Sequence, residues 1–453
     1  GFEHTMAELP IGLSMQQRSA WTVFPEGLGF CWDACSAGDL AHLRTTCRTD
    51  ACRFKSLVLA ALIAQLRDCR QRQARCASLV ALRGFGNAAA ASIPDLKEAL
   101  RDSDEQIRRQ AALALGSIRA EGSDSLAVLL QCLRDEATCV RVAVVKAIGQ
   151  LGVEAVCAAP DIAELLSDSS DCLREAVVQT LGRLALHASP DETCMGSASL
   201  CLLSFVAYCL RDALNDDDWN VRKASAVTLG GLVKEERLRR ILAICIPQML
   251  KSLADEDEDV RAAVADALGK FGQLETAAVH DLAALLADRH SEVRAASLRA
   301  LCCLGPAAAA TVEPVVSKLL LHEAPGVRET AAKVLGTLEH AATSTLLSLA
   351  EALADESVFV RAAASTALHR FATLAAPTIP RIVALLSHAH VGIRQVAVET
   401  IGLLGAVAIT RETLSELDRL AREDFDLNVR EAAAALVRVS RATASTPGSP
   451  SIA

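Results

Sequence analysis

Residues 255–269 read DEDEDVRAAVADALG, an acidic run followed by valine, arginine and a series of small and aliphatic residues. Val260, Val264 and Leu268 are spaced four apart, which places them on one face of an α-helix. The same phrase recurs along the chain: an Asp, four variable residues, an aliphatic residue, an Arg and, three residues later, a small apolar residue. Such self-similarity predicts a repeat protein. The arginines are Arg108, Arg141, Arg174, Arg222, Arg261, Arg294, Arg328, Arg361, Arg394 and Arg430, with a weaker copy at Arg75.

Most copies stand 33 or 34 residues apart, a length that suits two helices and their turns. The longest step, 48 residues from Arg174 to Arg222, predicts an insertion at about 187–205, with a loop over 187–196 and a lengthened first helix over 197–214. The prediction is an all-α fold, an α-solenoid (right-handed superhelix) of about eleven helix pairs over 54–438. Residues 1–53 are expected to be an N-terminal extension and cap, and 439–453 a disordered tail.

Glycine and proline mark the helices of each repeat. Gly272 and Gly405 stand eleven residues after their Arg, where a left-handed helix C-cap favours glycine. Gly269 and Gly336 lie inside the helices, which predicts close approach of the neighbouring repeat. Proline recurs eight residues before the Asp position and is expected in the first turn of a helix or at a tolerated bend. These prolines are Pro94, Pro160, Pro247, Pro314 and Pro380.

Composition points to helices that pack through small side chains. Apolar residues make up 51% of the chain but aromatic residues only 3%, so Ala, Leu and Val must fill the core. Sixteen cysteines lie mostly in apolar helical stretches, as at Cys132, Cys172, Cys209, Cys302 and Cys303, and are expected to be reduced core residues.

The net charge of −9 argues against a surface that neutralises phosphates, so nucleic acid is not an expected partner. No apolar run approaches the ~20 residues that span a bilayer. Residues 1–24 lack a basic start followed by an apolar stretch, and an intracellular, most simply cytoplasmic, location is expected.

The recurring Pro, Asp, Val and Arg at these offsets resemble the HEAT repeat, over about residues 54–438. The short 33-residue spacing is most similar to the HEAT-like repeats of phycobilisome lyases. The chain departs from the pattern where His322 and His388 replace the Asp, and where Cys302, His369 and Arg438 replace the inner glycine.

The resemblance implies that the repeated Asp and Arg residues form a ladder of ion pairs between adjacent repeats. A planar guanidinium also matches a carboxylate, and helix N-termini favour acidic residues. These residues are therefore expected to be structural. The ladder acids are Asp102, Asp135, Asp168, Asp216, Asp255, Asp288, Asp355 and Asp424.

The turns between helices should fall along one edge of the solenoid and add up to an acidic ridge. One interpretation is solvation and helix N-terminal capping; the other is a dock for a basic partner. The two richest turns carry Asp216, Asp217, Asp218, Asp255, Glu256, Asp257, Glu258 and Asp259.

The second helices are expected to line a concave face of mixed charge, which favours a protein partner over nucleic acid. The leading hypothesis is a non-catalytic interaction scaffold or adaptor subunit of a larger assembly, without cofactor, metal or small-molecule substrate. The candidate contacts on this face are Lys146, Asp266, Arg299, Lys333 and Glu399.

Enzymatic alternatives have little support. No phosphate-binding glycine loop, His-Glu-x-x-His phrase or recognisable nucleophile motif occurs. HEAT-type hydroxylases hold iron with repeated His-Glu pairs, whereas this chain has only His322-Glu323. The repeat subtype suggests an accessory subunit of a bilin (chromophore) lyase as the alternative function. A zinc site among Cys31, Cys35, Cys47, Cys52 and His42 lacks the usual pairing of ligands, so a cap for the first repeat is the preferred role of that segment.

Overall fold

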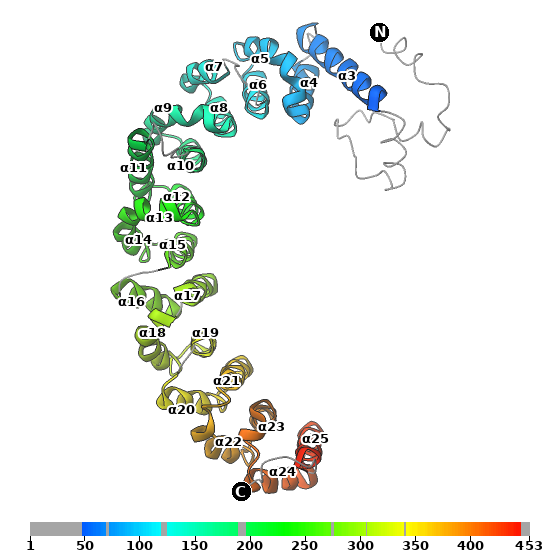
Figure 1. Ribbon diagram of the computed structural model, residues 1–453, viewed down its shortest axis with the longest axis vertical. Coiled ribbons are helices and arrows are strands. Elements are labelled where there is room, and N and C mark those ends of the chain that lie inside the picture. The colour runs from blue at the N-terminus through cyan, green and yellow to red at the C-terminus, as the bar shows by residue number, and fades with distance from the viewer. Residues whose placement is uncertain are drawn as a thin grey trace, which may run out of the picture. The chain divides into compact units, whose positions relative to one another are not determined.

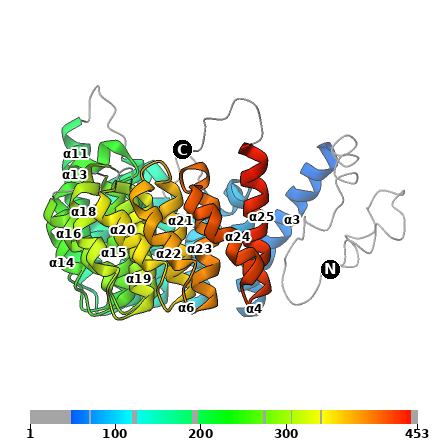
Figure 2. The same cartoon turned by 90° about the horizontal axis from the view of Figure 1, so that it is seen from below.

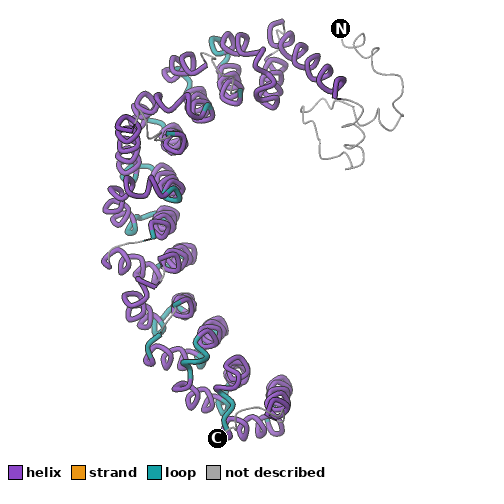
Figure 3. The backbone as a smooth tube through the Cα atoms, viewed as in Figure 1, coloured by secondary structure: helices purple, strands orange, loops and turns teal. Residues whose placement is uncertain are grey.

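The structure is a computed structural model, and it describes residues 48–68, 72–118, 125–188, 196–272, 276–304, 306–338 and 341–444. These residues form α-helices joined by short 3₁₀ segments and turns, and none of them lies in a strand (Figure 3). The all-α prediction is confirmed. The chain divides into two compact units, Gly1–His187 and Ala188–Ala453. The division falls at the start of the predicted insertion, where the repeat spacing is longest.

The first unit contains four helix pairs, each made of a first helix, a turn and a second helix. Short 3₁₀ segments η3 (Gly86–Ser92), η4 (Cys132–Arg134), η5 (Gly152–Ala158) and η6 (Glu164–Ser167) extend or join the first helices. The pairs are α3 (Arg48–Asp68) with α4 (Arg72–Phe85), α5 (Ile93–Ala99) with α6 (Glu105–Ser117), α7 (Ser125–Gln131) with α8 (Thr138–Gln150), and α9 (Ala159–Ala163) with α10 (Asp171–His187).

The second unit contains seven pairs, and α24 with α25 closes it at its C-terminal end (Figure 2). Its 3₁₀ segments are η7 (Ala243–Cys245), η8 (Leu285–Ala287), η9 (Ala376–Thr378) and η10 (Gly405–Val407). The first helices are α11 (Gly196–Ala213), α13 and α14 (Glu236–Leu242 and Ile246–Ser252), α16 (Thr276–Ala284), α18 (Pro306–Leu319), α20 (Thr343–Ala352), α22 (Ile379–Leu385) and α24 (Arg411–Glu423). The second helices are α12 (Trp219–Leu232), α15 (Glu258–Phe271), α17 (Ser291–Leu304), α19 (Pro325–Thr337), α21 (Val358–Arg370), α23 (Val391–Leu404) and α25 (Leu427–Ala444).

Within each unit the pairs stack side by side, with the first helices in an outer layer and the second helices in an inner layer (Figure 1). The eleven pairs of the described residues agree with the predicted number. The long helix expected in the insertion is α11.

Proline sets where most first helices begin. Pro94, Pro160, Pro247 and Pro380 occupy the first turns of α5, α9, α14 and α22, where their missing N–H needs no partner. Pro314 instead lies inside α18. The sequence predicted proline either in the first turn of a helix or at a bend within one, and the structure contains both.

The core between the layers is built from Ala, Leu and Val. Val260, Val264 and Leu268 of α15 are fully buried, as their spacing predicts. An added Cβ at Gly269 would lie 2.5 Å from Cα of Ala300 in α17, so α15 and α17 approach each other too closely for any side chain at this position. Gly272, just past α15, has φ +82°, the left-handed conformation that glycine adopts readily. Both predicted glycine roles are confirmed here.

The cysteines of the described residues are free, as predicted, but the prediction that they are core residues is wrong for most of them. Only Cys245 is buried; Cys132 and Cys209 are half-buried, and Cys172, Cys302 and Cys303 are exposed. The apolar periodicity predicts the helices that contain these cysteines. The cysteines themselves lie outside the buried face of each helix, at positions where a small apolar side chain can be exposed at little cost in free energy.

The ends of the repeat region differ from the predicted bounds. Helix α3 begins at Arg48, within the predicted extension, and α25 continues to Ala444, within the predicted tail. Residues 1–47 and 445–453, including most of the candidate zinc ligands, lie outside the described residues.

One described stretch, Arg72–Ala99, is long and apolar enough to cross a membrane by length and composition. In the structure it is not a single α-helix, because α4, η3 and α5 divide it, with a bend at Gly86 where φ is +52°. Its buried side chains, Leu79, Leu82 and Leu96, belong to the repeat core.

Candidate protein-binding surface

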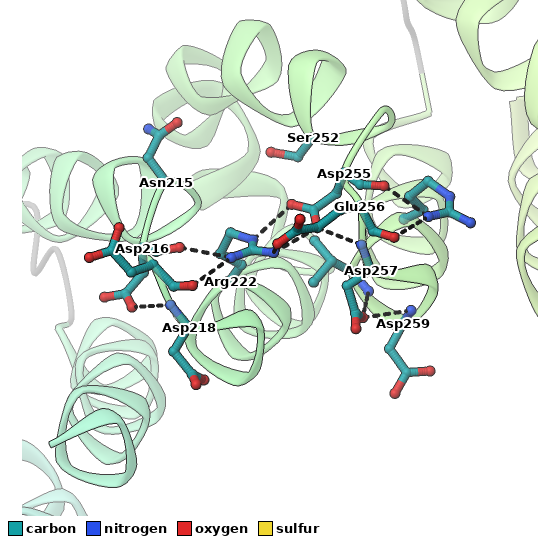
Figure 4. Close-up of polar contacts among 12 residues, drawn as sticks. Asn215, Asp216, Asp218, Arg222, Ser252, Asp255, Glu256, Asp257 and Asp259 are labelled. Atoms are coloured by element: carbon teal, nitrogen blue, oxygen red, sulfur yellow. Dashed lines mark hydrogen bonds and ion pairs between the residues drawn. The ribbon is translucent and has the colours of Figure 1, made fainter.

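The turns between first and second helices are joined to one another by ladder arginines. In α12, Nε and Nη2 of Arg222 donate to the two carboxylate oxygens of Asp255 in the next turn, both at 2.8 Å (Figure 4). Nη1 of the same Arg donates to the backbone oxygens of Asp216 and Asp217 in its own turn, at 3.0 and 3.1 Å. One guanidinium therefore fixes two consecutive turns side by side.

This arrangement recurs in both units. The side chains involved are almost buried, as at Arg261 and Asp288, which are 8% and 11% exposed. The ladder implied by the HEAT resemblance is thus present between neighbouring repeats. Its rungs are Arg75–Asp102, Arg108–Asp135 and Arg141–Asp168 in the first unit, and Arg222–Asp255, Arg261–Asp288, Arg328–Asp355 and Arg394–Asp424 in the second.

The rungs shift the proton affinities of their members. The hydrogen bond from Arg394 lowers the pKa of Asp424, against the opposing effect of burial. At Asp288, burial alone would raise the pKa, but the hydrogen bonds from Arg261 and from a backbone amide outweigh it, and the pKa is lowered. The hydrogen bond to Asp255 raises the pKa of Arg222. In the Arg261–Asp288 and Arg394–Asp424 rungs, the lowered pKa keeps the Asp ionised at neutral pH.

The acidic turn cluster, residues 216–218 and 255–259, consists of two consecutive turns held together by Arg222 (Figure 4). Several of its carboxylates have structural partners. Asp218 caps α12 by accepting the N–H of Asn220, and Asp257 caps α15 by accepting those of Asp259 and Val260. Asp216 and Asp255 accept the N–H groups of Asp218 and Asp257 in the same way. The capping interpretation is therefore confirmed for Asp218 and Asp257, whereas Asp216 and Asp255 stabilise the turn before each helix.

The remaining acids of the cluster lie at the surface. Asp259 forms an ion pair with Lys223 at 2.7 Å. Asp217, Glu256 and Glu258 are exposed, and the Glu256 side chain retains 89% of its accessible surface although it lies 3.6 Å from Arg222. These three carboxylates are the part of the cluster that a partner could bind.

The five candidate residues of the inner layer share one position, five residues after the ladder Arg. Asp266 and Arg299 form a two-bond ion pair between α15 and α17, at 3.0 and 2.9 Å. Lys333 pairs with Glu329 within α19, and Glu399 accepts a hydrogen bond from Gln395 within α23. Lys146 on α8 belongs to the first unit and is exposed, and the four residues of the second unit lie on four different helices.

Sequence reasoning missed a set of exposed apolar side chains at the turns of the second unit. Phe425 is fully exposed, Leu321 is 86% exposed and Phe359 is 67% exposed. Their signal was available: large apolar residues stand in the turn or in the first turn of the second helix, where other repeats carry smaller or polar ones. Such residues are common in surfaces that contact other proteins.

No group of three or more potential metal ligands comes together among the described residues. The His322-Glu323 pair lies in a turn, where Nδ1 of His322 accepts the N–H of Ala324 and the backbone oxygen of Glu323 accepts from Arg328. His322 thus takes part in the turn.

Stacked helix pairs with a shared core and a repeated Arg–Asp ladder define an α-solenoid repeat protein. The sequence matches the family of HEAT repeats at residues 59–138, 210–302 and 279–368, more than half of the chain. The chain belongs to the HEAT-repeat family. The phycobilisome-lyase subtype is not established by this match.

Solved structures with the same fold include importin beta, at 14% identity and a TM-score of 0.58, covering 89% of this chain and 59% of that one. Kap95p bound to RanGDP is similar at 13% identity and a TM-score of 0.60, covering 88% and 58%. At these identities the likeness shows the fold alone, and the chain spans about three fifths of those proteins. The sequence matches no curated protein.

Proposed function

We propose that the chain is a non-catalytic scaffold that binds a basic segment of a partner protein at the acidic turn cluster, within a larger assembly. The observation that carries this proposal is the exposure of Asp217, Glu256 and Glu258 on two turns that Arg222 locks together. Because the neighbouring acids are engaged in caps and rungs, the backbone that presents these three is already fixed. A partner would lose little entropy in ordering it.

The fold supports the same proposal. HEAT-repeat proteins have an extended surface, and importin beta and the RanGDP-bound Kap95p share this chain's architecture. The inner layer of the second unit, with Arg299, Lys333 and Glu399, offers a second contact region of mixed charge. A protein partner rather than nucleic acid, and an intracellular location, remain parts of the proposal.

The test is affinity purification of the full chain with crosslinking mass spectrometry, followed by a charge-neutral variant. Asp217→Asn, Glu256→Gln and Glu258→Gln together remove three exposed charges, of which only that of Glu256 lies near a rung, 3.6 Å from Arg222. The matched control neutralises three exposed acids of the outer layer of the first unit, Glu154→Gln, Asp161→Asn and Glu164→Gln.

We expect the cluster variant to lose the crosslinked partner and the control to keep it. Binding by the parent chain should weaken as salt is raised, because exposed charges are screened. A partner that stays bound to the cluster variant, or whose affinity is indifferent to salt, would contradict the proposal. The accessory-lyase alternative predicts a visible absorbance band on purification from a pigment-bearing host.

A further inference from the structure

Two ladder arginines of the second unit have no carboxylate opposite them. Arg294 in α17 and Arg361 in α21 face repeats in which His322 and His388 stand in the place of the Asp. Each histidine still stabilises the turn between the two helices, because its Nδ1 accepts the backbone N–H of the residue two positions later, at 3.1 Å. Within the described residues neither arginine forms an ion pair, so these two rungs lack their anion.

The two guanidinium groups are held in place nonetheless. Nη1 of Arg361 donates to the backbone oxygens of Asp355 and Glu356 at 2.9 and 3.0 Å, and Nη1 of Arg294 makes the equivalent pair of bonds in its own turn. Nε of each is buried and makes no hydrogen bond. Arg361 is only 7% exposed, as buried as Arg328, which has Asp355 as its partner. A buried cation without an opposite charge is unfavourable.

Both arginines point at the start of the next second helix. An added Cβ at Gly392 would lie 2.8 Å from Nη2 of Arg361, and one at Gly326 would lie 2.6 Å from Nη2 of Arg294. In this unit only these two repeats have glycine two residues before the ladder Arg. The others carry Asn220, Asp259, Glu292, Phe359 and Asn428.

Each guanidinium group therefore lies against the positive end of a helix dipole, Arg294 at α19 and Arg361 at α23. The N-termini of α19 and α23, helices of 13 and 14 residues, carry partial positive charge, and the N–H of Gly392 in α23 donates to Nδ1 of His390. Because Nδ1 of His322 and His388 accepts a hydrogen bond, the neutral ring carries its proton on Nε2, which adds a donor. An oxyanion here would be attracted by the arginine and the helix end together.

We propose that Arg294 and Arg361 each bind a carboxylate of a partner protein, which takes the place of the missing Asp. A carboxylate fits because Nη2 of the ladder arginine donates to one in the intact rungs, as from Arg328 to Asp355. Exposed apolar side chains flank both positions: Leu321 precedes His322, and Val391 precedes Gly392. The partner segment would thus carry acidic and apolar residues. This inference rests on the proposed scaffold function but concerns a different surface and the opposite charge.

The test uses a fluorescein-labelled Glu-Ala repeat peptide, with binding to the full chain followed by anisotropy. His388→Asp supplies the carboxylate from within the chain and should occupy Arg361. We expect the peptide to bind the parent chain and its affinity to fall about tenfold in His388→Asp, which corresponds to the loss of one charge-assisted contact. His280→Asp is the control, because His280 is exposed on α16 in the outer layer and the charge change is the same.

The melting temperature of His388→Asp should rise, which would show that the rung has formed and that the variant is folded. His322→Asp tests the Arg294 position independently. Equal peptide affinity in the parent chain and in the double variant His322→Asp/His388→Asp, in which both arginines face an internal carboxylate, would overturn the proposal. Loss of peptide binding alone leaves the basic-partner function of the acidic turn cluster untouched.

Discussion

Arg261 in α15 donates two hydrogen bonds to Asp288 in the following repeat, from Nε at 2.8 Å and from Nη2 at 3.1 Å. Its Nη1 donates to the backbone oxygens of Asp255 and Glu256 in its own repeat. Replacement by alanine removes both sets of bonds and leaves the Asp288 carboxylate almost buried without its cation. We expect Arg261→Ala to lower the free energy of unfolding by ~3 kcal/mol, measured by urea denaturation and by the melting temperature.

Arg299→Ala is the matched control for that variant. Arg299 also bonds to an Asp of a neighbouring repeat through two hydrogen bonds, but its side chain is 56% exposed. The expected loss is at most ~1 kcal/mol, as for ion pairs in solvent. Equal losses in the two variants would show that burial of the rung does not matter.

Gly269→Ala should destabilise the second unit although alanine is the better helix former. The new methyl would lie 2.5 Å from Cα and 2.8 Å from Cβ of Ala300, so α15 and α17 would have to separate. We expect a net loss of ~1–3 kcal/mol, typical of an overpacked core. Gly231→Ala in α12 serves as the control, because nothing lies within 4 Å of its added Cβ. There the gain in helix propensity, up to ~1 kcal/mol, should prevail in thermal unfolding.

The ladder should make the chain sensitive to acid. The pKa of Asp424 is lowered by its hydrogen bond from Arg394, so the folded state binds this proton less readily than the unfolded state. The stabilisation is complete above the ordinary Asp pKa of ~3.9 and is lost as the pH falls through the lowered value. The free energy of unfolding, measured by urea denaturation between pH 6 and 3, should decline as the pH falls. Asp424→Asn should be less stable at pH 6 and should decline less steeply.

Capping and binding in the acidic turn cluster can be separated by two single substitutions. Asp257→Ala removes the N-cap of α15 and should cost ~1 kcal/mol of stability. Glu258→Ala, one residue away, removes an exposed side chain and should leave stability within ~0.5 kcal/mol. If Asp257→Ala melts like the parent chain, the hydrogen bonds from Asp259 and Val260 are not stabilising.

The fold could be predicted from the sequence because the same pattern of residues occurs in each repeat. The spacing of Val260, Val264 and Leu268 specifies a helix face, and the recurrence of Asp and Arg specifies how the next repeat docks. The exposure of the cysteines could not be predicted in this way. Cys172, Cys302 and Cys303 lie in apolar helices but between their buried faces, and a small side chain carries no periodic signal.

The candidate site was only partly visible in the sequence. The acidic turns could be located in the sequence, but the sequence does not distinguish Asp217 from Asp218 and Asp257. The hydrogen bonds of the structure show that Asp218 and Asp257 cap helices and that Asp217 is exposed. The division of the chain at His187 required the structure, because it depends on which residues contact one another. The apolar residues Phe359 and Phe425 can be found in the sequence, but their degree of exposure cannot.

The ladder also bears on how such a chain can change in length. Most intact rungs join Nε and Nη2 of an Arg to the two carboxylate oxygens of an Asp, so an Arg does not distinguish one neighbouring Asp from another. Excision of one whole repeat between Arg222 and Asp288 would place an arginine opposite an aspartate again. Duplication or deletion of complete repeats therefore preserves the register of the joints, whereas the loss of part of a repeat breaks it.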